Sequence, residues 1–354
     1  MIKSKLRGGM CKMRIFEGYQ RGINLGGWLS QCDHDKRTYD TFITEDDIKR
    51  IASWGLDHVR LPIDYELIQD DSREFREEGF IYIDRCIDWC KRQGINLILD
   101  LHKTAGYSFD EQDTETRFFQ SQELQQRFVD LWEEFAKRYG DSDNSVAFEL
   151  LNEIVDESAA EEWNKLIART IRVIRNYTQN TKIIIGGVLF NGVTAIKFLE
   201  PPADKNIVYN FHCHEPLIFT HQSAYWVEGM PSDYKMVYPS PLKVMKTETE
   251  KILDDTRTQI YDVSCLTEMG QDFFEKIFFE AEAMSQLRNV PLYCGEYGVI
   301  DKAPLDSTLK WFQDIHAVFE KKHIGRAVWN YKGKDFGIMD SHYDPIREEL
   351  IKYL

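Results

Sequence analysis

Two short segments of the chain end in a glutamate and have the composition of a buried strand. The first is Leu-Leu-Asn-Glu, which ends at Glu153, and the second is Tyr-Cys-Gly-Glu, which ends at Glu296. Both consist largely of apolar or β-favouring residues, so each predicts a strand that presents a carboxylate at its C-terminal tip. A buried ionised carboxylate is costly, because a low-dielectric interior disfavours charge. Two such acids are the pair that hydrolysis of a glycosidic bond requires, and we predict this chemistry.

The two glutamates can divide that reaction between them. In the retaining mechanism, one acid protonates the leaving oxygen and one carboxylate attacks the anomeric carbon. Glu153, at the end of the fourth predicted strand, suits the acid/base, and Glu296, at the end of the seventh, suits the nucleophile. Opposite strand tips of a barrel can hold two carboxyl groups about 5–5.5 Å apart, the retaining separation. The alternative is that each glutamate is only a structural ion-pair partner.

Other polar residues end predicted strands and are candidates for the same site. Arg60, at the end of the second strand, is expected to donate a hydrogen bond to Glu296 and keep it ionised. His102 ends the third strand and is a candidate to bind a sugar hydroxyl. Trp329, on the eighth strand, is a candidate to stack against a sugar ring. A core histidine and a core tryptophan are the alternatives at these two positions.

Two histidines spaced two apart, His212 and His214, raise the alternative of a metal site. They flank Cys213 after the sixth predicted strand and should point to the same side. Such a pair can bind zinc, as in metal-dependent barrel hydrolases, which usually carry it on the first strand. Here the first strand ends at residues 24–27 without a histidine. We therefore expect no metal and no other cofactor, with a zinc hydrolase as the alternative.

Short apolar runs alternate with longer amphipathic segments along the chain. Strands are predicted at residues 22–27, 58–62, 96–102, 146–153, 182–187, 207–212, 292–296 and 327–331. Helices are predicted at residues 44–54, 81–93, 122–139, 159–177, 270–287 and 305–323, with shorter pieces near 193–199 and 345–354. Eight strand–helix units in sequence favour an α/β fold, the (β/α)8 TIM barrel, over a doubly wound open sheet. The candidate residues then lie at the carboxyl ends of the strands, where barrel active sites are built.

One connection is too long for an ordinary loop. Residues 215–269 separate the sixth predicted strand from its helix and include Trp226 and a charged run at 246–255. Connections of this length usually have a structure or function of their own. We predict a single catalytic barrel domain over residues 1–354, with 215–269 as an inserted helical subdomain near the active-site mouth. A surface insertion without function is the alternative.

Composition and charge restrict the partners. The 354 residues include 44 Lys and Arg against 59 Asp and Glu, a formal net charge of −15. This negative charge argues against nucleic acid or an anionic membrane as a partner. No apolar stretch reaches the length of about 20 residues that a membrane span needs. We expect a monomer that acts on a neutral ligand.

The cysteines and the N-terminus bear on the cellular compartment. The seven cysteines are odd in number and lack zinc-type spacing, so we expect mostly reduced thiols. Cys86 and Cys90 lie four apart in a helical pattern and are expected to face one core. Residues 1–16 are basic and lack a continuous apolar segment, so no signal peptide is predicted. We expect a cytoplasmic protein, or a secreted one if a leader has been removed from this sequence.

Seven short motifs follow one another across nearly the whole chain. They are Asn-Leu-Gly-Gly-Trp at 24–28, Val-Arg-Leu-Pro at 59–62, Leu-His at 101–102, Leu-Asn-Glu at 151–153, Tyr-Asn-Phe-His at 209–212, Gly-Glu-Tyr-Gly at 295–298 and Val-Trp-Asn-Tyr at 328–331. Together they resemble glycoside hydrolase family 5, the cellulase family of clan A. The chain looks closest to clostridial single-domain endoglucanases that carry a helical insertion after strand six, a likeness to which Phe-Thr-His-Gln at 219–222 belongs.

The resemblance implies roles for the candidate residues. Glu153 would be the acid/base and Glu296 the nucleophile, with net retention of anomeric configuration and no cofactor. Asn152 would contact the sugar 2-hydroxyl beside the cleaved bond, where hydrogen bonds tighten in the transition state. The supporting residues would be Arg60, His102, Asn152, His212 and Trp329.

Two positions depart from the family pattern. His214, which we keep as a substrate-binding candidate, stands where the family usually has a tyrosine near the nucleophile. An imidazole can be charged near neutrality, so we expect its protonation to shape the acidic limb of the pH profile. Lys103 follows His102, where relatives often have a second histidine or an asparagine. We expect it to alter the negative subsites or to pair with a nearby acid.

These observations predict a retaining endo-β-1,4-glucanase that hydrolyses soluble or amorphous β-glucans, including mixed-linkage glucan. A β-mannanase or an exo-acting β-glucosidase of the same family is the first alternative. A catalytically silent sugar-binding barrel is the second, and the presence of both glutamates argues against it.

Overall fold

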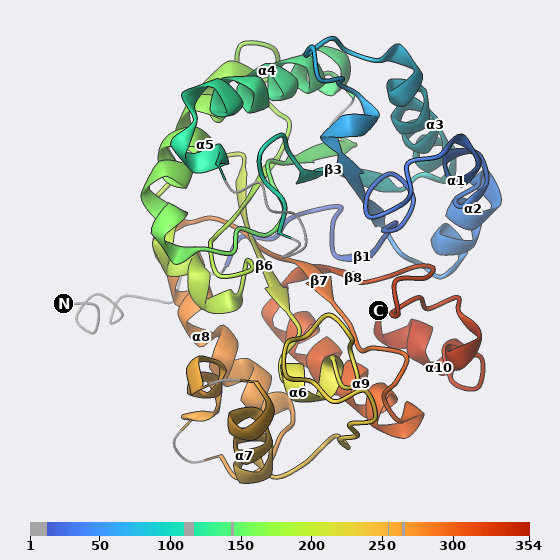
Figure 1. Cartoon of the computed structure of the whole chain (residues 1–354), viewed down its shortest axis with the longest axis vertical. Helices are drawn as coiled ribbons and strands as arrows, with labels where there is room; N and C mark the ends of the chain where they lie inside the picture. The colour runs from blue at the N-terminus through green and yellow to red at the C-terminus, as the bar shows by residue number, and fades with distance from the viewer. Residues whose placement is uncertain (1–12, 110–116, 143–144, 254, 264–265) are drawn as a thin grey trace.

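The fold is a closed barrel of parallel strands, seen in a computed structural model that describes residues 13–109, 117–142, 145–253, 255–263 and 266–354 (Figure 1). Each strand pairs with the next, and β8 pairs with β1 to close the barrel. The strands are β1 (Arg21–Asn24), β2 (His58–Asp64), β3 (Asn96–Lys103), β4 (Val146–Glu149), β5 (Ile183–Gly186), β6 (Ile207–Cys213), β7 (Leu292–Tyr297) and β8 (Gly325–Val328). The predicted (β/α)8 TIM barrel is confirmed.

Helices surround the strands, with α4 and α5 on one side of the barrel in Figure 1 and α8 and α9 on the other. The α-helices are α1 (Lys36–Thr41), α2 (Glu45–Ser53), α3 (Glu77–Gln93), α4 (Gln122–Tyr139), α5 (Ala160–Ile174), α6 (Leu217–Thr220), α7 (Leu242–Ile252), α8 (Gln271–Arg288), α9 (Leu305–Lys322) and α10 (Arg347–Leu350). Between β5 and β6 the connection is a 3₁₀ helix, Val193–Phe198. The predicted helices agree with these elements apart from their ends.

Local sequence signals set the ends of the helices. Thr44 and Asp47 form a capping box at the start of α2, which satisfies two backbone N–H groups. Helix α3 begins at Glu77 rather than at residue 81, because acidic residues in the first turn interact favourably with the helix dipole. It ends at Gly94, whose φ of 67° favours glycine.

Strand β4 ends earlier than predicted, and this moves Glu153 off the strand. The prediction placed 146–153 in one strand, whereas β4 ends at Glu149. The N–H of Leu150 donates to the carbonyl of Ile184 in β5, but the N–H of Asn152 donates to Leu101 in β3. Residues two apart in a regular strand face the same neighbour, so this switch of partner ends the strand. Glu153 therefore follows β4 in the connection to α5.

The first and last strands are also shorter than predicted. The prediction continued the first strand to residue 27 and the eighth to residue 331, but β1 ends at Asn24 and β8 at Val328. Trp329 lies directly after β8, although its N–H still donates to Tyr297 of β7 at 2.8 Å. Glu296 lies on β7, as predicted.

Side chains along each strand point alternately into the barrel and away from it, so the inward-pointing side chains fill the interior in layers. Side chains two apart on a strand face the same side. Ile98, Asp100 and His102 of β3 therefore all face the barrel interior, at successive levels toward the carboxyl end. At the level of Ile98, apolar side chains form a small core of their own: Phe16, Tyr19, Ile98, Ala147, Ile184, Val208, Tyr293 and Ala327. The next level toward the carboxyl ends is polar and includes buried Arg60. The apolar layer therefore supports a charged layer beneath the barrel mouth.

The long connection between β6 and α8 contains helical segments. They are α6, α7 and a 3₁₀ helix at Asp255–Tyr261. Figure 1 shows α7 at the lower edge of the molecule, near α8. The connection is tied to α9, because the hydroxyl of Tyr238 donates to Asp314 at 3.0 Å and the indole of Trp311 donates to the Glu215 carbonyl at 3.0 Å.

The described residues test part of the predictions on cysteines and membrane spans. Cys32, Cys86, Cys90, Cys213 and Cys294 are free thiols, and the paired positions Cys86 and Cys90 lie buried in one core, as expected. Cys11 and Cys265 lie outside the described residues, as does most of the segment 1–16 on which the signal-peptide prediction rests. In the part of the chain that the structure describes, every helix is too short or too polar to cross a membrane.

Candidate active site

Arg60, fully buried on β2, is the central cation of the site. Its Nη1 donates to Oε1 of Glu296 at 2.7 Å, the hydrogen bond expected from the sequence. Its Nε and Nη2 donate to the two carboxylate oxygens of Glu149 at 2.7 and 2.9 Å. A bidentate pair of this kind fixes the plane of the guanidinium. Arg60 is therefore held by Glu149 while it bonds Glu296.

Further contacts of Arg60 join other strands to this network. Its Nη2 donates to Oδ1 of Asn152 at 2.8 Å and lies 3.0 Å from Oδ2 of Asp100. Burial would lower the pKa of Arg60, but the neighbouring carboxylates, Asp100 first, raise it well above its ordinary value. The guanidinium therefore stays charged, and it orients Asn152 next to the glutamate that follows it.

Glu149 and Asp100 are parts of the site that the sequence interpretation missed. Both are fully buried, and Glu149 also accepts a hydrogen bond from the amide of Asn210 at 2.7 Å. Burial raises the pKa of Glu149, against the opposing charge of Arg60. The signal was available at Asp100, which stands two residues before His102 and so faces the same side of β3.

Glu296 is buried among positive groups, with 8% of its side chain exposed. Nδ1 of His212 and Nε2 of His214 each lie 4.0 Å from its Oε2, so both histidines point to the same side, as predicted. Burial would raise the pKa of Glu296, but His212, Arg60 and His214 outweigh it and lower the pKa below its ordinary value. The carboxylate is therefore kept ionised, which a nucleophile requires.

Glu153 faces Glu296 and is more open to solvent, with 14% of its side chain exposed. Its Oε1 lies 2.7 Å from Nδ1 of His212, and its backbone carbonyl accepts from the hydroxyl of Tyr107 at 3.0 Å. One carboxylate oxygen of Glu153 and one of Glu296 lie within 4.8 Å of each other. The two acids thus flank a common space at the barrel mouth.

The rings of His102 and Trp329 stack on each other. Their rings are parallel, with centroids 5.7 Å apart and an interplanar angle of 5°. Nδ1 of His102 lies 2.7 Å from Oδ2 of Asp100. Burial would lower the pKa of His102, but Asp100 raises it above its ordinary value. An imidazole held by Asp100 and an indole beside it suit a sugar ring, which has both hydroxyls and apolar C–H groups.

The same acids must be considered as metal ligands. Among the residues that the structure describes, Glu153, His212 and Glu296 bring three potential ligand atoms within 4.8 Å of one another. However, Nδ1 of His212 and Oε1 of Glu153 are only 2.7 Å apart. Two ligands of one tetrahedral zinc ion lie about 3.3 Å apart, given metal–ligand bonds of about 2.0–2.1 Å. This donor set fits a hydrogen bond better than a zinc site.

The two positions that depart from the family pattern both have acidic partners. His214 contacts Glu296, and although burial would lower the pKa of His214, Glu296 raises it above its ordinary value. Nζ of Lys103 lies 3.0 Å from Oε1 of Glu66, so the expected pairing with a nearby acid is present. The raised pKa favours the protonated form of His214 beside the buried acid.

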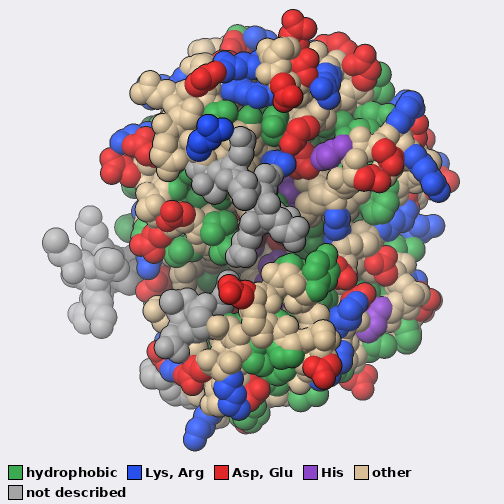
Figure 2. All heavy atoms as spheres, in the orientation of Figure 1, with side chains coloured by type: hydrophobic (Ala, Val, Ile, Leu, Met, Phe, Trp, Pro, Cys, Tyr) green, Lys and Arg blue, Asp and Glu red, His purple; other side chains and the backbone are tan. Residues whose placement is uncertain are grey.

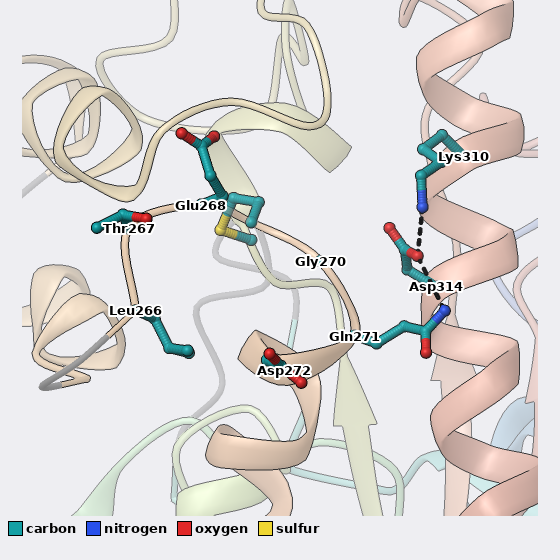
Figure 3. A pocket seen from close by; sticks show the side chains of 9 residues that line it. Leu266, Thr267, Glu268, Gly270, Gln271, Asp272, Lys310 and Asp314 are labelled. Atoms are coloured by element: carbon teal, nitrogen blue, oxygen red, sulfur yellow. Dashed lines mark hydrogen bonds and ion pairs between the residues drawn. The ribbon is translucent and has the colours of Figure 1, made fainter.

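Figure 2 gives a space-filling view of one face of the molecule. Histidine side chains are visible deep in the middle of the face drawn in Figure 2, with acidic and hydrophobic side chains around them. A separate pocket of about 470 Å³ is lined by residues 266–272, Lys310 and Asp314 (Figure 3). There Asp314 accepts from Lys310 at 2.5 Å and from Gln271 at 3.5 Å. This pocket contains none of the residues predicted to carry chemistry.

Comparisons with known proteins identify the family. The sequence model of the family described as "Cellulase (glycosyl hydrolase family 5)" matches residues 18–335. Cellodextrinase A of Ruminococcus flavefaciens is 41% identical over 309 residues, which cover 87% of this chain and 84% of the relative. Endoglucanase C of Acetivibrio thermocellus is 39% identical over 340 residues, which cover 95% of this chain and 98% of the relative.

Solved structures give the same answer for the fold. Endoglucanase Cel5A from the hyperthermophilic Thermotoga maritima superimposes with a TM-score of 0.76 at 26% identity, over 95% of this chain and 96% of that chain. Cel5A structures in complex with cellobiose and with mannotriose have TM-scores of 0.75 and 0.76, at 25% and 26% identity. Both complexes cover 95% of this chain and 97% of the solved chain.

Proposed function

Because the chain belongs to glycosyl hydrolase family 5 and is therefore a cellulase-type glycoside hydrolase, we propose that it is a retaining endo-β-1,4-glucanase. The observation that carries the mechanism is the approach of Glu153 and Glu296, whose nearest carboxylate oxygens lie within 4.8 Å. Inverting enzymes keep their carboxyl groups about 6.5–9.5 Å apart to admit a water, whereas retaining enzymes keep them about 5–5.5 Å apart. The short separation supports direct attack by one carboxylate.

In this mechanism, the carboxylate of Glu296 attacks the anomeric carbon while Glu153 donates a proton to the leaving oxygen. The glycosidic bond breaks and a glycosyl ester of Glu296 forms. Glu153, now a carboxylate, then takes a proton from water, and that water cleaves the ester with a second inversion. Arg60 keeps Glu296 ionised and oriented for attack, and His212 holds the carboxyl group of Glu153 at 2.7 Å.

The substrate proposed is soluble or amorphous β-1,4-glucan, including mixed-linkage glucan. Support comes from the endoglucanase and cellodextrinase relatives at about 40% identity, which match nearly the whole chain. In this proposal Asn152, whose Oδ1 accepts from Arg60, would contact the sugar 2-hydroxyl beside the cleaved bond. A β-mannanase is the second candidate, because the structural relative Cel5A has been solved in complex with mannotriose.

Glu153→Ala tests both the mechanism and the substrate. Removal of the acid should lower glucan hydrolysis by about 10²–10⁴-fold, because the leaving oxygen loses its proton donor. Azide should restore turnover of a substrate with a good leaving group and yield a β-glycosyl azide, detected by NMR. Wild-type enzyme should release β-configured product first from carboxymethyl cellulose and barley glucan, with little cleavage of mannan.

The matched control is Glu157→Ala, an exposed glutamate in the same connection, which should keep wild-type activity without azide. An α-glycosyl azide, or no effect of azide, would contradict the role of Glu153. Faster cleavage of mannan than of glucan would favour the second candidate.

His214→Phe tests how the ionisation of Glu296 is maintained. The imidazole of His214 contributes to the lowered pKa of Glu296, so its loss should raise that pKa toward the ordinary value. Glu296 would then become protonated at a higher pH on acidification. We expect the acidic limb of kcat/KM against pH to move to higher pH, measured with an aryl cellobioside. An unchanged acidic limb would mean that His214 does not act on Glu296.

A further inference from the structure

A second cluster of reactive side chains lies outside the glutamate site, in the connection between β1 and α1. Cys32 and His34 of this connection meet Asp64 at the end of β2. Nε2 of His34 lies 3.2 Å from Oδ2 of Asp64, and Nδ1 of the same ring lies 3.7 Å from Sγ of Cys32. A thiol, an imidazole and a carboxylate in this order are the arrangement of an activated nucleophile, in which a third group orients the ring.

The carboxylate of this cluster is held rigidly. Asp64 is 4% exposed and accepts hydrogen bonds from the hydroxyl of Ser30 at 2.7 Å and from the N–H of Gln31 at 3.2 Å. His34 adopts a left-handed backbone conformation, with φ of 53°, which is uncommon for a residue with a side chain. The chain is thus folded back so that the imidazole reaches Asp64.

The imidazole supplies a positive charge next to the sulfur. Hydrogen bonds with Asp64 and then Cys32 raise the pKa of His34 to about 10, so the ring is a cation at neutral pH. A neighbouring cation favours the thiolate, which is the reactive form of a cysteine. The flanking carboxylates Asp33 and Asp35 accept from Thr38 instead, at 2.9 and 2.7 Å.

We propose that Cys32 is a thiol-modification site for low-molecular-weight disulfides, activated by the His34–Asp64 pair. Cys32 is partly exposed, whereas the other cysteines in the described part of the chain are buried. In the reaction, the Cys32 thiol releases its proton to solvent and its sulfur attacks one sulfur of the disulfide. A new S–S bond forms, the old one breaks and the second sulfur leaves as a thiolate.

The test uses hydroxyethyl disulfide on the full chain at neutral pH, with the rate at each cysteine followed by peptide-resolved mass spectrometry. Cys32 should react about tenfold faster in the protein than in a synthetic peptide of residues 28–40. The gain is expected because the imidazole cation, 3.7 Å from Sγ, stabilises negative charge on the attacking sulfur. His34→Asn should remove most of this advantage, since asparagine tolerates the left-handed backbone.

Tyr39→Phe is the matched control. Nδ1 of His34 also lies 2.8 Å from the Tyr39 hydroxyl, so this change leaves the pair with Asp64 in place and frees Nδ1 for the sulfur. The rate at Cys32 should stay the same or rise. Equal rates in the wild type, in His34→Asn and in the peptide would overturn the proposal. Equal losses in His34→Asn and Tyr39→Phe would overturn it as well, because they would indicate a general change of the loop.

Discussion

Glu296→Gln is expected to abolish hydrolysis of β-glucan and to leave sugar binding largely intact. Glutamine has the volume of glutamate and can still accept the hydrogen bond from Arg60, but an amide is a very poor nucleophile toward the anomeric carbon. Removal of a covalent nucleophile lowers turnover by on the order of 10⁴–10⁶-fold. Release of reducing sugar measures the loss, and calorimetric titration with a cello-oligosaccharide measures the retained binding.

A suitable control for this variant is Glu282→Gln on α8. Glu282 is also a buried glutamate bonded to a cation, since Nζ of Lys322 donates to it at 2.9 Å, but it lies on α8, outside the barrel strands. Its replacement should leave turnover near the wild-type value. Near-normal turnover in Glu296→Gln would remove this residue from the role of nucleophile.

Arg60→Met should have the largest effect on stability of any single change in the site. Arg60 donates to Glu296 and Glu149 and lies 3.0 Å from Asp100, and all three carboxylates are buried. Without the cation, these buried acids must either remain charged without their partner or take up protons. Breaking a buried pair in this way costs about 3–5 kcal/mol, so the free energy of unfolding in urea should fall by that amount. Activity should fall with it, because Glu296 loses its main donor.

A second variant separates lost charge pairing from lost packing. Adding Glu149→Gln to Arg60→Met removes one of the buried carboxylates that have lost their cation, and it should restore part of the lost stability. In the wild-type background, the same Glu149→Gln change should destabilise, because Arg60 then loses its bidentate partner. Equal effects of Glu149→Gln in both backgrounds would mean that the two side chains are not coupled.

Much of the fold follows from local patterns. Apolar strands alternate with amphipathic helices whose ends carry recognisable signals, such as the capping box of Thr44 and the terminal Gly94 of α3. Strand existence was therefore predictable, but strand ends were not. The end of β4 is set by a change of hydrogen-bond partner from β5 to β3, and a single strand considered alone contains no information about its neighbours.

The site was predictable where a polar residue stands at the end of a predicted strand. This rule identified Glu296, Arg60 and His102, which the barrel brings together from β7, β2 and β3. It missed Glu149, which lies within a predicted strand. The neighbouring sequence does not indicate whether a buried cation from another strand will pair with such a carboxylate. It also missed the contact of His34 with Asp64, which joins residues from separate connections.

The amino-acid sequence alone determined the order of strands and helices, the two acids and the motifs of the family, since these depend on residue type and spacing along the chain. Only the tertiary structure decided that Glu153 stands beyond its strand, within 4.8 Å of Glu296, and that Arg60 is shared among three carboxylates. The physical reason is that barrel closure and strand register set distances between residues far apart in the chain, and ionisation in a buried site depends on those distances.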